Sequence, residues 1–363
     1  MKTQKDPAHH LVLGVSGLIL TQAEQQWLKK NRPAGVILFS RNIDNLKQLS
    51  SLIKSIHNTS IPAPTIWIDQ EGGRVQRIRS PFTKFPSPYR FTQLYRENQK
   101  AGLEMAYLGG MVCGRELASI GIGVNCAPVL DISQKNADPV IGNRAFGNTP
   151  QEVIQLAKEW INGLATTGVM AVGKHFPGHG AAQVDSHKDL PTIKKSRAEL
   201  ESHELIPFKS LANRLPALMT AHLIAEGIDT INPATWSSVS LKNILRKQWG
   251  YKGLIVSDAV EMGALKGDLA DRVYNSLLAG CDLVLCCTGS LDDNQEALQG
   301  ATRAVEDMNN QERNDSMERI STVLSPYRQP EEHKLDDEEY TKARNRLEAL
   351  GETILNDDPT ESS

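Results

Sequence analysis

Three histidines, a lysine and an aspartate lie close together between Lys174 and His187. Among them, Asp185 and His187 are two residues apart, so on an extended loop the carboxylate can hydrogen bond to the imidazole. A carboxylate in this position fixes the tautomer of the ring and stabilises its charged form. His187 is therefore a candidate proton donor and acceptor, with Asp185 as its partner. The alternative is a polar loop in which the aspartate only caps a turn.

The same stretch also suggests a metal site, because His175 and His179 have the spacing of the paired histidines in a zinc-binding helix. Pro177 and Gly178 lie between them, however, and this pair breaks a helix. The two imidazoles therefore need not share a face. A metal-dependent hydrolase that uses His175, His179 and His187 stays open as an alternative, but the expectation is a protein without a metal or another cofactor.

A second candidate for chemistry is Asp258, which follows the apolar run Leu254–Ser257. A carboxylate at the carboxyl end of a barrel strand points into the mouth of the barrel, where it can attack an electrophilic carbon or coordinate a metal. The alternative is a helix N-cap, because good helix-forming residues follow Asp258. The residues alone do not decide between these two roles.

Two further segments place arginines beside glycines. Residues 69–77 read Asp-Gln-Glu-Gly-Gly-Arg-Val-Gln-Arg, in which the glycines suggest a backbone held close to a ligand. Residues 142–147 read Gly-Asn-Arg-Ala-Phe-Gly, in which Arg144 could reach a sugar hydroxyl, a carbonyl or a carboxylate. Either segment could instead be a surface turn that carries charges.

These residues belong to a chain in which short apolar runs alternate with longer amphipathic stretches. The runs are rich in Val, Ile or Leu without strict alternation, which is typical of strands buried on both faces of a parallel sheet. The predicted strands are 12–16, 35–40, 65–69, 124–128, 169–174, 217–222, 254–258 and 282–286. The first predicted helix begins at the capping box Thr21–Glu24, and the others are 46–56, 102–120, 150–167, 197–211, 241–249 and 269–278.

Eight strands with intervening helices predict an α/β protein, a single-domain TIM-type (β/α)8 barrel, with a doubly wound open sheet as the alternative. A barrel keeps its active site at the carboxyl ends of its strands. Several polar residues fall there: Asp69, Lys174, His175, His222 and Asp258. The predicted division of the chain is a catalytic barrel at 1–308, a helical acidic extension at 309–355 that packs on the barrel, and a disordered tail at 356–363.

The composition excludes several kinds of partner. Lys and Arg together number 40 against 43 for Asp and Glu, so neither nucleic acid nor an anionic membrane surface is expected. The longest apolar run, Leu11–Leu20, is too short to span a bilayer, and no secretory signal is expected. Five cysteines without a Cys-x-x-Cys pair favour the reducing cytoplasm. The expected partner is a small-molecule substrate, and the expected assembly is a monomer or a weak homodimer.

Taken together, the polar strings resemble glycoside hydrolase family 3. They are Lys-His-Phe-Pro-Gly-His-Gly followed by Asp-Ser-His, Asp-Gln-Glu-Gly-Gly-Arg-Val-Gln-Arg, Gly-Asn-Arg-Ala-Phe-Gly and Ser-Asp-Ala-Val-Glu-Met. Within that family, the chain is similar to the single-domain bacterial β-N-acetylglucosaminidases of peptidoglycan recycling, in order from about Leu13 to Met308. The resemblance implies a TIM barrel, in agreement with the strand count.

The resemblance also implies roles for individual residues. Asp258 corresponds to the catalytic nucleophile, and His187 to the general acid/base with Asp185 as its partner. The residues that correspond to those holding the non-reducing N-acetylglucosamine are Asp69, Arg77, Arg144, Lys174 and His175. The family usually has a second acid after the nucleophile, where this chain has Ala259. This departure puts the local hydrogen bonding in question more than the activity.

The function that the resemblance implies is a retaining exo-β-N-acetylglucosaminidase acting on peptidoglycan fragments, such as GlcNAc-anhydro-N-acetylmuramic acid with or without its peptide. Such an enzyme needs a carboxylate that forms a glycosyl-enzyme and a proton donor for the leaving oxygen. Larger β-glucosidases of the family take this donor from an additional domain, for which the chain leaves no room, so the Asp-Ser-His loop favours the N-acetylglucosaminidase. The alternatives are a phosphorylase, a broad β-glycosidase of the same family and a sugar-binding barrel without catalysis.

Overall fold

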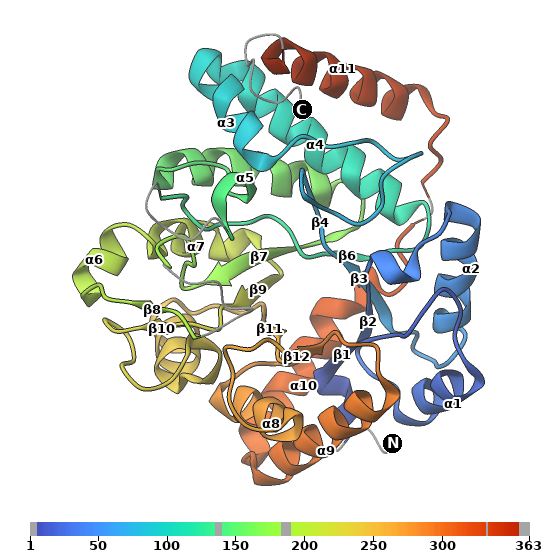
Figure 1. The fold of residues 1–363 in the computed structure, drawn as a ribbon, viewed down its shortest axis with the longest axis vertical. Helices are drawn as coiled ribbons and strands as arrows, with labels where there is room; N and C mark the ends of the chain where they lie inside the picture. The colour runs from blue at the N-terminus through green and yellow to red at the C-terminus, as the bar shows by residue number, and fades with distance from the viewer. Residues whose placement is uncertain (1–5, 135–139, 183–189, 332, 356–363) are drawn as a thin grey trace.

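The computed structural model describes residues 6–134, 140–182, 190–331 and 333–355. In these ranges, eight parallel strands form a barrel that closes where the last strand pairs with the first (Figure 1). In order around the barrel they are β1 (Leu11–Gly14), β2 (Gly35–Leu38), β3 (Thr65–Ile68), β6 (Val124–Asn125), β7 (Met170–Phe176), β9 (Ala217–Thr220), β11 (Leu254–Ala259) and β12 (Leu283–Cys286). The predicted (β/α)8 barrel is confirmed, and the open sheet is excluded.

Alternate side chains of each strand fill the barrel or face the surrounding helices. On β2, Ile37 belongs to the interior core, whereas Val36 and Leu38 pack in the layer between the strands and the helices. Trp67 of β3 is fully buried in the interior, where its indole N–H donates to Thr65 Oγ1 at 2.7 Å. Because both faces of the strands are apolar, the strands form the continuous apolar runs from which the sequence pattern predicted them.

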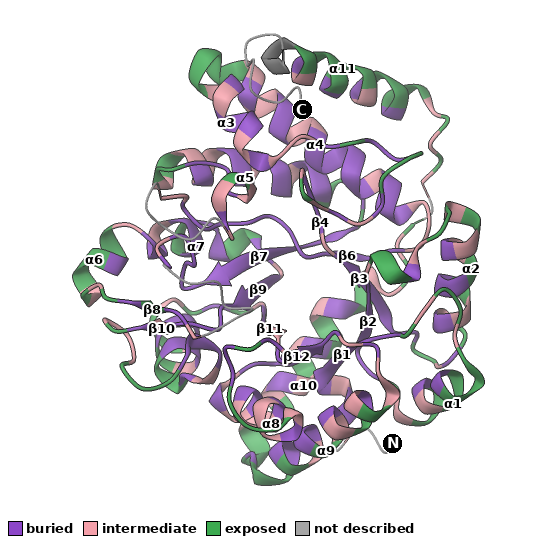
Figure 2. Ribbon diagram, in the orientation of Figure 1, coloured by how far each residue is buried: buried purple, intermediate pink, exposed green. Residues whose placement is uncertain are grey.

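Helices surround the barrel and bury one face each (Figure 2). The first, α1 (Gln22–Asn31), begins at the predicted capping box, in which Glu24 N–H donates to Thr21 Oγ1 and Thr21 N–H donates to the Glu24 carboxylate. The other long helices up to residue 307 are α2 (Leu46–His57), α3 (Pro88–Glu97), α4 (Gln99–Ala118), α5 (Pro150–Ala165), α8 (Leu269–Ala279) and α9 (Leu291–Asp307).

Two predicted helices differ in the structure. The segment 197–211 is divided into α6 (Arg197–Ser202) and α7 (Leu205–Leu211), because His203 between them has a non-helical backbone. The segment 241–249 is a π-helix, η6 (Val239–Gln248). The 3-10 segments are η1 (Pro7–His10), η2 (Ser40–Asn42), η3 (Gly142–Arg144), η4 (Ala212–Arg214), η5 (Ala234–Trp236) and η7 (Ser325–Tyr327). Among the helices that the structure describes, none combines the length and the hydropathy that crossing a membrane requires.

Two helices follow α9. Along α10 (Asn310–Leu324), Ile320 and Leu324 join the interior core of the barrel from its amino-terminal end. The last helix, α11 (Glu338–Leu355), packs on α4, where the Tyr340 hydroxyl donates to the buried Glu116 carboxylate at 2.9 Å. The same carboxylate accepts from the N–H and the hydroxyl of Thr83, at 2.8 and 2.7 Å. The predicted tail at 356–363 lies outside the described residues, and the division at 308 stays a prediction.

Two small sheets extend the carboxyl-terminal rim of the barrel. The strands β4 (Gln70–Gly72) and β5 (Val75–Gln76) form a hairpin directly after β3, and its turn requires glycine because Gly72 and Gly73 have φ of +102° and +57°. The amide of Asn125 anchors this hairpin to β6, since it accepts from Gln70 N–H and donates to the Gln70 carbonyl, both at 3.0 Å. The other pair is β8 (Thr192–Ile193) with β10 (Ile224–Ala225).

Candidate active site

A cavity of about 530 Å³ lies at the carboxyl ends of the barrel strands, where barrel enzymes bind their substrates. Its volume is in the range of small-ligand sites. Its wall contains Asp258 and all five residues that were predicted to hold the sugar, which are Asp69, Arg77, Arg144, Lys174 and His175. The predicted acid/base pair, Asp185 and His187, lies outside the described residues.

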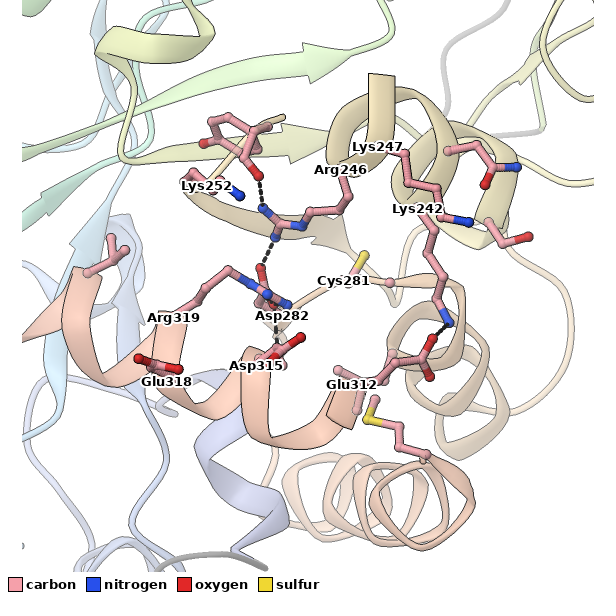
Figure 3. Close-up of a pocket in the computed structure, with 18 of the residues that line it drawn as sticks. Lys242, Arg246, Lys247, Lys252, Cys281, Asp282, Glu312, Asp315, Glu318 and Arg319 are labelled. Atoms are coloured by element: carbon pink, nitrogen blue, oxygen red, sulfur yellow. Dashed lines mark hydrogen bonds and ion pairs between the residues drawn. The ribbon is translucent and has the colours of Figure 1, made fainter. Parts of the chain in front are cut away.

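A larger cavity of about 760 Å³ lies at the opposite end of the barrel, between η6, α8 and α10 (Figure 3). There Arg246 and Arg319 both donate to the buried Asp282 carboxylate, at 2.5 and 2.8 Å. Lys242 of η6 pairs with Glu312 of α10 at 2.7 Å. These pairs join the helices to each other and to the strand ends, and the amino-terminal end of such barrels serves stability. We therefore place the active site in the cavity at the carboxyl ends.

The buried carboxylate of Glu71, the partly exposed carboxylate of Asp69 and three cations form an ion-paired network in the wall of the active-site cavity. The Lys174 ammonium lies 2.8 Å from Asp69 Oδ1 and 2.6 Å from Glu71 Oε1. Arg144 donates to both oxygens of Glu71, from Nε at 2.8 Å and from Nη2 at 2.9 Å. Arg77 donates to Asp69 Oδ2 at 3.0 Å. Each charged group is thus fixed in direction, which allows the network to bind a polar ligand in one orientation.

The network keeps its members charged. Burial would raise the pKa of Glu71, but Arg144 and Lys174 outweigh this effect and lower the pKa to about 2. Burial also opposes the ionisation of Asp69, yet Lys174 and Arg77 hold the pKa of Asp69 well below its usual range. Burial would lower the pKa of Lys174, and the two carboxylates raise it instead. At neutral pH the wall therefore offers ionised acceptors and charged donors to a ligand.

Aromatic contact holds Arg77 from a second side. Its guanidinium carbon lies 5.3 Å from the centre of the Phe39 ring. Arg41 lies over the same ring at 4.9 Å and donates to the carbonyls of Val15 and Cys287. Phe39, Arg41 and Arg77 all line the cavity. The edge of the cavity near β2 is therefore formed by two cations that pack on one aromatic ring.

A buried aspartate that the sequence interpretation missed holds His175. Asp131 Oδ2 lies 2.7 Å from His175 Nδ1, and Asp131 Oδ1 accepts from the main-chain N–H of His179 at 2.6 Å. Burial would raise the pKa of Asp131, but His175 lowers it, so the carboxylate is ionised and Nδ1 of the ring carries a proton. His175 Nε2 then lies 3.4 Å from Arg144 Nη2. The available signal was a carboxylate shortly after the predicted strand at 124–128.

Asp258 lies within strand β11 and not at the start of a helix. The next helix, α8, begins at Leu269 with Asp268 as its N-cap, so the N-cap interpretation of Asp258 is wrong. The Ala259 N–H donates to Asp258 Oδ1 at 2.8 Å. Burial would raise the pKa of Asp258, but the neighbouring His175 and this N–H lower it. The carboxylate is therefore ionised in the cavity, as a nucleophile must be.

Glu261 brings another carboxyl group to the cavity beside Asp258. The Cys287 N–H donates to both of its oxygens, at 3.0 and 3.1 Å. Burial raises the pKa of Glu261, and the negative charge of Asp258 adds to this effect. The acid that the resemblance led us to expect at position 259 is thus absent, while Glu261 lines the cavity two residues further on. Glu261 belongs to the Ser-Asp-Ala-Val-Glu-Met motif, but its residue type and position did not predict a role for it.

Of the three histidines in the metal alternative, His175 and His179 lie within the described residues, and both rings contact other side chains of the protein. The rings of His175 and His179 meet edge to face with their centres 6.2 Å apart, and His175 Nδ1 is bound to Asp131. His187, the third histidine of that alternative, lies outside the described residues. Within the described ranges, His, Cys, Asp and Glu side chains form no group of three that could hold a metal ion.

Comparisons with known proteins show the family to which the chain belongs. Residues 12–323 match the N-terminal domain of glycosyl hydrolase family 3. A β-hexosaminidase of Alkalilimnicola ehrlichii is 41% identical over 280 residues, which are 76% of this chain and 80% of that protein. One from Thioalkalivibrio sulfidiphilus is 35% identical over 348 residues, which are 95% of this chain and 97% of that protein.

Among solved structures, NagZ from Neisseria gonorrhoeae in complex with N-trifluoroacetyl-D-glucosamine is similar with a TM-score of 0.81 and 34% identity. The similarity covers 94% of this chain and 98% of that one. The family match spans every residue that lines the cavity, and the NagZ structure shares the fold. The chain therefore belongs to glycosyl hydrolase family 3, as a glycoside hydrolase of the β-N-acetylhexosaminidase class.

Proposed function

We propose that the protein is a retaining exo-β-N-acetylglucosaminidase of cell-wall recycling in the cytoplasm. Its substrate in this proposal is GlcNAc-anhydro-N-acetylmuramic acid, with or without peptide, from which it removes the non-reducing N-acetylglucosamine. The observation that carries the proposal is the ionised carboxylate of Asp258 in a cavity whose wall is the network around Lys174 and Glu71. Such a cavity combines a nucleophile with fixed groups for sugar hydroxyls.

The reaction takes two displacements at the anomeric carbon. In the first, Asp258 attacks this carbon and the glycosidic C–O bond breaks, while the leaving oxygen takes a proton from His187. In the second, His187 takes a proton from a water molecule, whose oxygen displaces Asp258 and restores the β configuration. In this proposal Asp185 stabilises the charged imidazole of His187. The protein ends each cycle with Asp258 ionised and His187 protonated.

The network holds the sugar over Asp258 in this scheme. Lys174 and Arg77 donate to hydroxyls, and the ionised Asp69 accepts from them. Arg144 and His175, which lie side by side in the wall, serve as the remaining sugar contacts. NagZ from Neisseria gonorrhoeae was solved with N-trifluoroacetyl-D-glucosamine. That ligand carries an acylated amino group at carbon 2, which supports N-acetylglucosamine as the sugar here.

The cysteines support the proposed compartment. All five of them lie within the described residues as buried free thiols. Proteins that fold in oxidising compartments commonly pair their cysteines, whereas free thiols are ordinary in the cytoplasm.

The test of substrate and stereochemistry compares an aryl N-acetyl-β-glucosaminide with the matching aryl β-glucoside. We expect a strong preference for the acetamido sugar, and NMR should show the β anomer as the first product. Equal rates on the two substrates would overturn the choice of sugar, and an α product would overturn retention. The same assay in inorganic phosphate separates hydrolysis from phosphorolysis, since a phosphorylase accumulates the sugar 1-phosphate.

The test of the nucleophile replaces Asp258 by Asn. We expect turnover to fall by roughly 10⁴-fold or more while the protein stays folded, because the side chain lies in the cavity and not in the core. A mechanism-based fluorosugar should label Asp258 in the wild type. A label on another carboxylate would assign the nucleophile elsewhere.

A further inference from the structure

His222 is a fully buried histidine two residues beyond the end of β9, next to the strand that carries Asp258. Its Nε2 lies 3.0 Å from the carbonyl oxygen of Ala259, and its Nδ1 lies 2.8 Å from Thr235 Oγ1. Neither ring nitrogen is left for substrate. His222 is also absent from the cavity wall, so its contacts point to a role inside the protein and not to a sugar contact.

The partners of His222 determine its tautomer. A carbonyl oxygen can only accept, so Nε2 must carry a proton and donate to Ala259. Burial lowers the pKa of His222, although Asp258 and the Ala259 carbonyl act in the opposite direction, so the ring is neutral at neutral pH. Nδ1 is then the acceptor in its contact with the Thr235 hydroxyl, whose single proton it shares with the Ala221 carbonyl 3.1 Å away. Thr235 Oγ1 can accept in turn from the Thr220 hydroxyl 2.8 Å away. A chain of buried hydroxyls therefore fixes the ring.

The residue that His222 binds is also the one whose N–H orients Asp258, and the two hydrogen bonds use the two peptide groups that flank the Ala259 Cα. The carbonyl side of Ala259 accepts from His222, and the N–H side of the same residue donates to Asp258 Oδ1 at 2.8 Å. The pairing of β11 with β12 shifts register between Val256 and Ala259, so the ladder is irregular here, and on the β12 side the Val260 N–H donates to the Leu285 carbonyl at 3.0 Å. His222 supplies a hydrogen bond at the point where the sheet is irregular.

We propose that His222 is a positioning residue for the nucleophile, which holds Ala259 so that its N–H keeps the Asp258 carboxylate in the attacking direction. The inference rests on the proposed function, in which Asp258 attacks the anomeric carbon. It assigns no contact with the sugar to His222. Misplacing a reacting group by about 1 Å can slow a reaction by about 100-fold, so loss of His222 should act on the rate of glycosylation and not on binding of the sugar.

The test uses three variants of the full chain. His222→Leu fills a similar volume without a donor, and we expect its kcat and its rate of labelling by a fluorosugar to fall by about 10-fold to 100-fold while KM changes by less than about threefold. His222→Gln places an amide N–H near the former Nε2, so it should recover most of the loss. Thr235→Val removes the hydroxyl that fixes the ring, and we expect a smaller loss of the same kind.

His10→Leu is the matched control. His10 is also fully buried and its Nδ1 contacts the main-chain carbonyl of Asp282, but it lies at the amino-terminal end of the barrel. We expect this variant to lose stability and to keep the wild-type kcat per folded molecule. The melting temperature of each variant separates a loss of folded protein from a loss of rate.

The outcomes distinguish this inference from the proposed function. If the fluorosugar labels Asp258 equally fast in the wild type and in a folded His222→Leu, the positioning role is wrong and the nucleophile stands. If it labels another carboxylate in the wild type, the assigned nucleophile is wrong. Should His222→Leu fail to fold, Thr235→Val decides: wild-type labelling in this variant overturns the positioning role, and a slower rate at unchanged KM supports it.

Discussion

The carboxylate of Asp131 and the imidazole of His175 form a buried pair in which Oδ2 and Nδ1 are 2.7 Å apart. Asp131 does not line the cavity, whereas His175 does. The same carboxylate accepts from the main-chain N–H groups of His175 and His179. It therefore fixes the His175 ring and the backbone at the end of β7 and just beyond it, and it determines which nitrogen of His175 faces a ligand.

Replacing Asp131 by Asn tests this relationship. Asparagine has the same shape but offers one accepting oxygen in place of two, so at least one of the donors loses its partner and the His175 ring is less fixed. A hydrogen bond to a charged group contributes about 1.5–3 kcal/mol, so we expect kcat/KM to fall by about 10-fold to 100-fold, mainly through KM. Steady-state kinetics on an aryl N-acetylglucosaminide measure this. Asp229→Asn is the control, since Asp229 also accepts from two main-chain N–H groups but in an exposed turn.

Glu71 should make the free energy of unfolding depend on pH in the acid range. Its pKa is about 2 in the folded chain against an ordinary value of 4.5, so the ionised form stabilises the folded state. This contribution is complete above the ordinary pKa and is lost as the pH falls toward the folded pKa. A shift of this size corresponds to on the order of 3 kcal/mol. Urea unfolding of Glu71→Gln should show a free energy lowered by about this amount at pH 7 and a flatter dependence below pH of about 4.5.

A suitable comparison for Glu71→Gln is Glu199→Gln in the exposed capping box of α6. The carboxylate of Glu199 also accepts hydrogen bonds, but it is in contact with water, so we expect a much smaller loss of stability than in Glu71→Gln. Identical acid dependence in the wild type and Glu71→Gln would mean that Arg144 and Lys174 do not stabilise the ionised carboxylate.

Glu261 should behave in the opposite sense. Burial raises the pKa of Glu261, so its ionised form destabilises the fold, and this penalty appears as the pH rises from the ordinary pKa through the folded one. Glu261→Gln keeps an oxygen for the Cys287 N–H and removes the charge. We expect a higher melting temperature at pH 7 to 8 and little change near pH 4. Because Asp258 loses a negative neighbour, the acid limb of kcat/KM should move to lower pH, and an unmoved limb would show that the two carboxylates are not coupled.

The proposed acid/base role of His187 predicts a dependence on the leaving group. His187→Ala should slow substrates with poor leaving groups most, because those need a proton on the departing oxygen. Activated aryl substrates should lose less in the glycosylation step. Asp185→Asn should give a milder form of the same pattern, since the imidazole is still present. An equal loss across a series of leaving groups in His187→Ala would point to a binding role, and the acid would then have to be sought at His175 or His179.

The barrel could be predicted because its strands are buried on both faces. The apolar side chains that fill the interior and those that face the helices make unbroken runs, and each of the eight strands lies within three residues of its predicted ends. The sequence did not reveal the break at His203 or the wide turns of η6. Both depend on how helices pack against neighbours that are distant in the chain.

For Asp69 and Lys174, the residue type and the place at a strand end together predicted a position in the cavity, whereas Arg77 and Arg144 were assigned only through the family resemblance. Asp131 was missed because its importance comes from a contact with His175, 44 positions away. The partnership of Glu71 with Arg144 spans 73 positions. The role of Asp258 could not be decided from local sequence, because the same residues would suit the end of a strand or the start of a helix.

The hairpin formed by β4 and β5 carries Glu71 into the cavity. Two other parts of the chain hold this hairpin in place. One is the barrel itself, through the Asn125 amide. The other is the following segment, where the Phe85 carbonyl accepts from Gly73 N–H and where Thr83 is bound to Glu116. Glu116 also receives the hydroxyl of Tyr340, 224 residues further along the chain. The last helix thus supports the hairpin from outside the barrel, so the position of Glu71 depends in part on a helix that does not line the proposed sugar site.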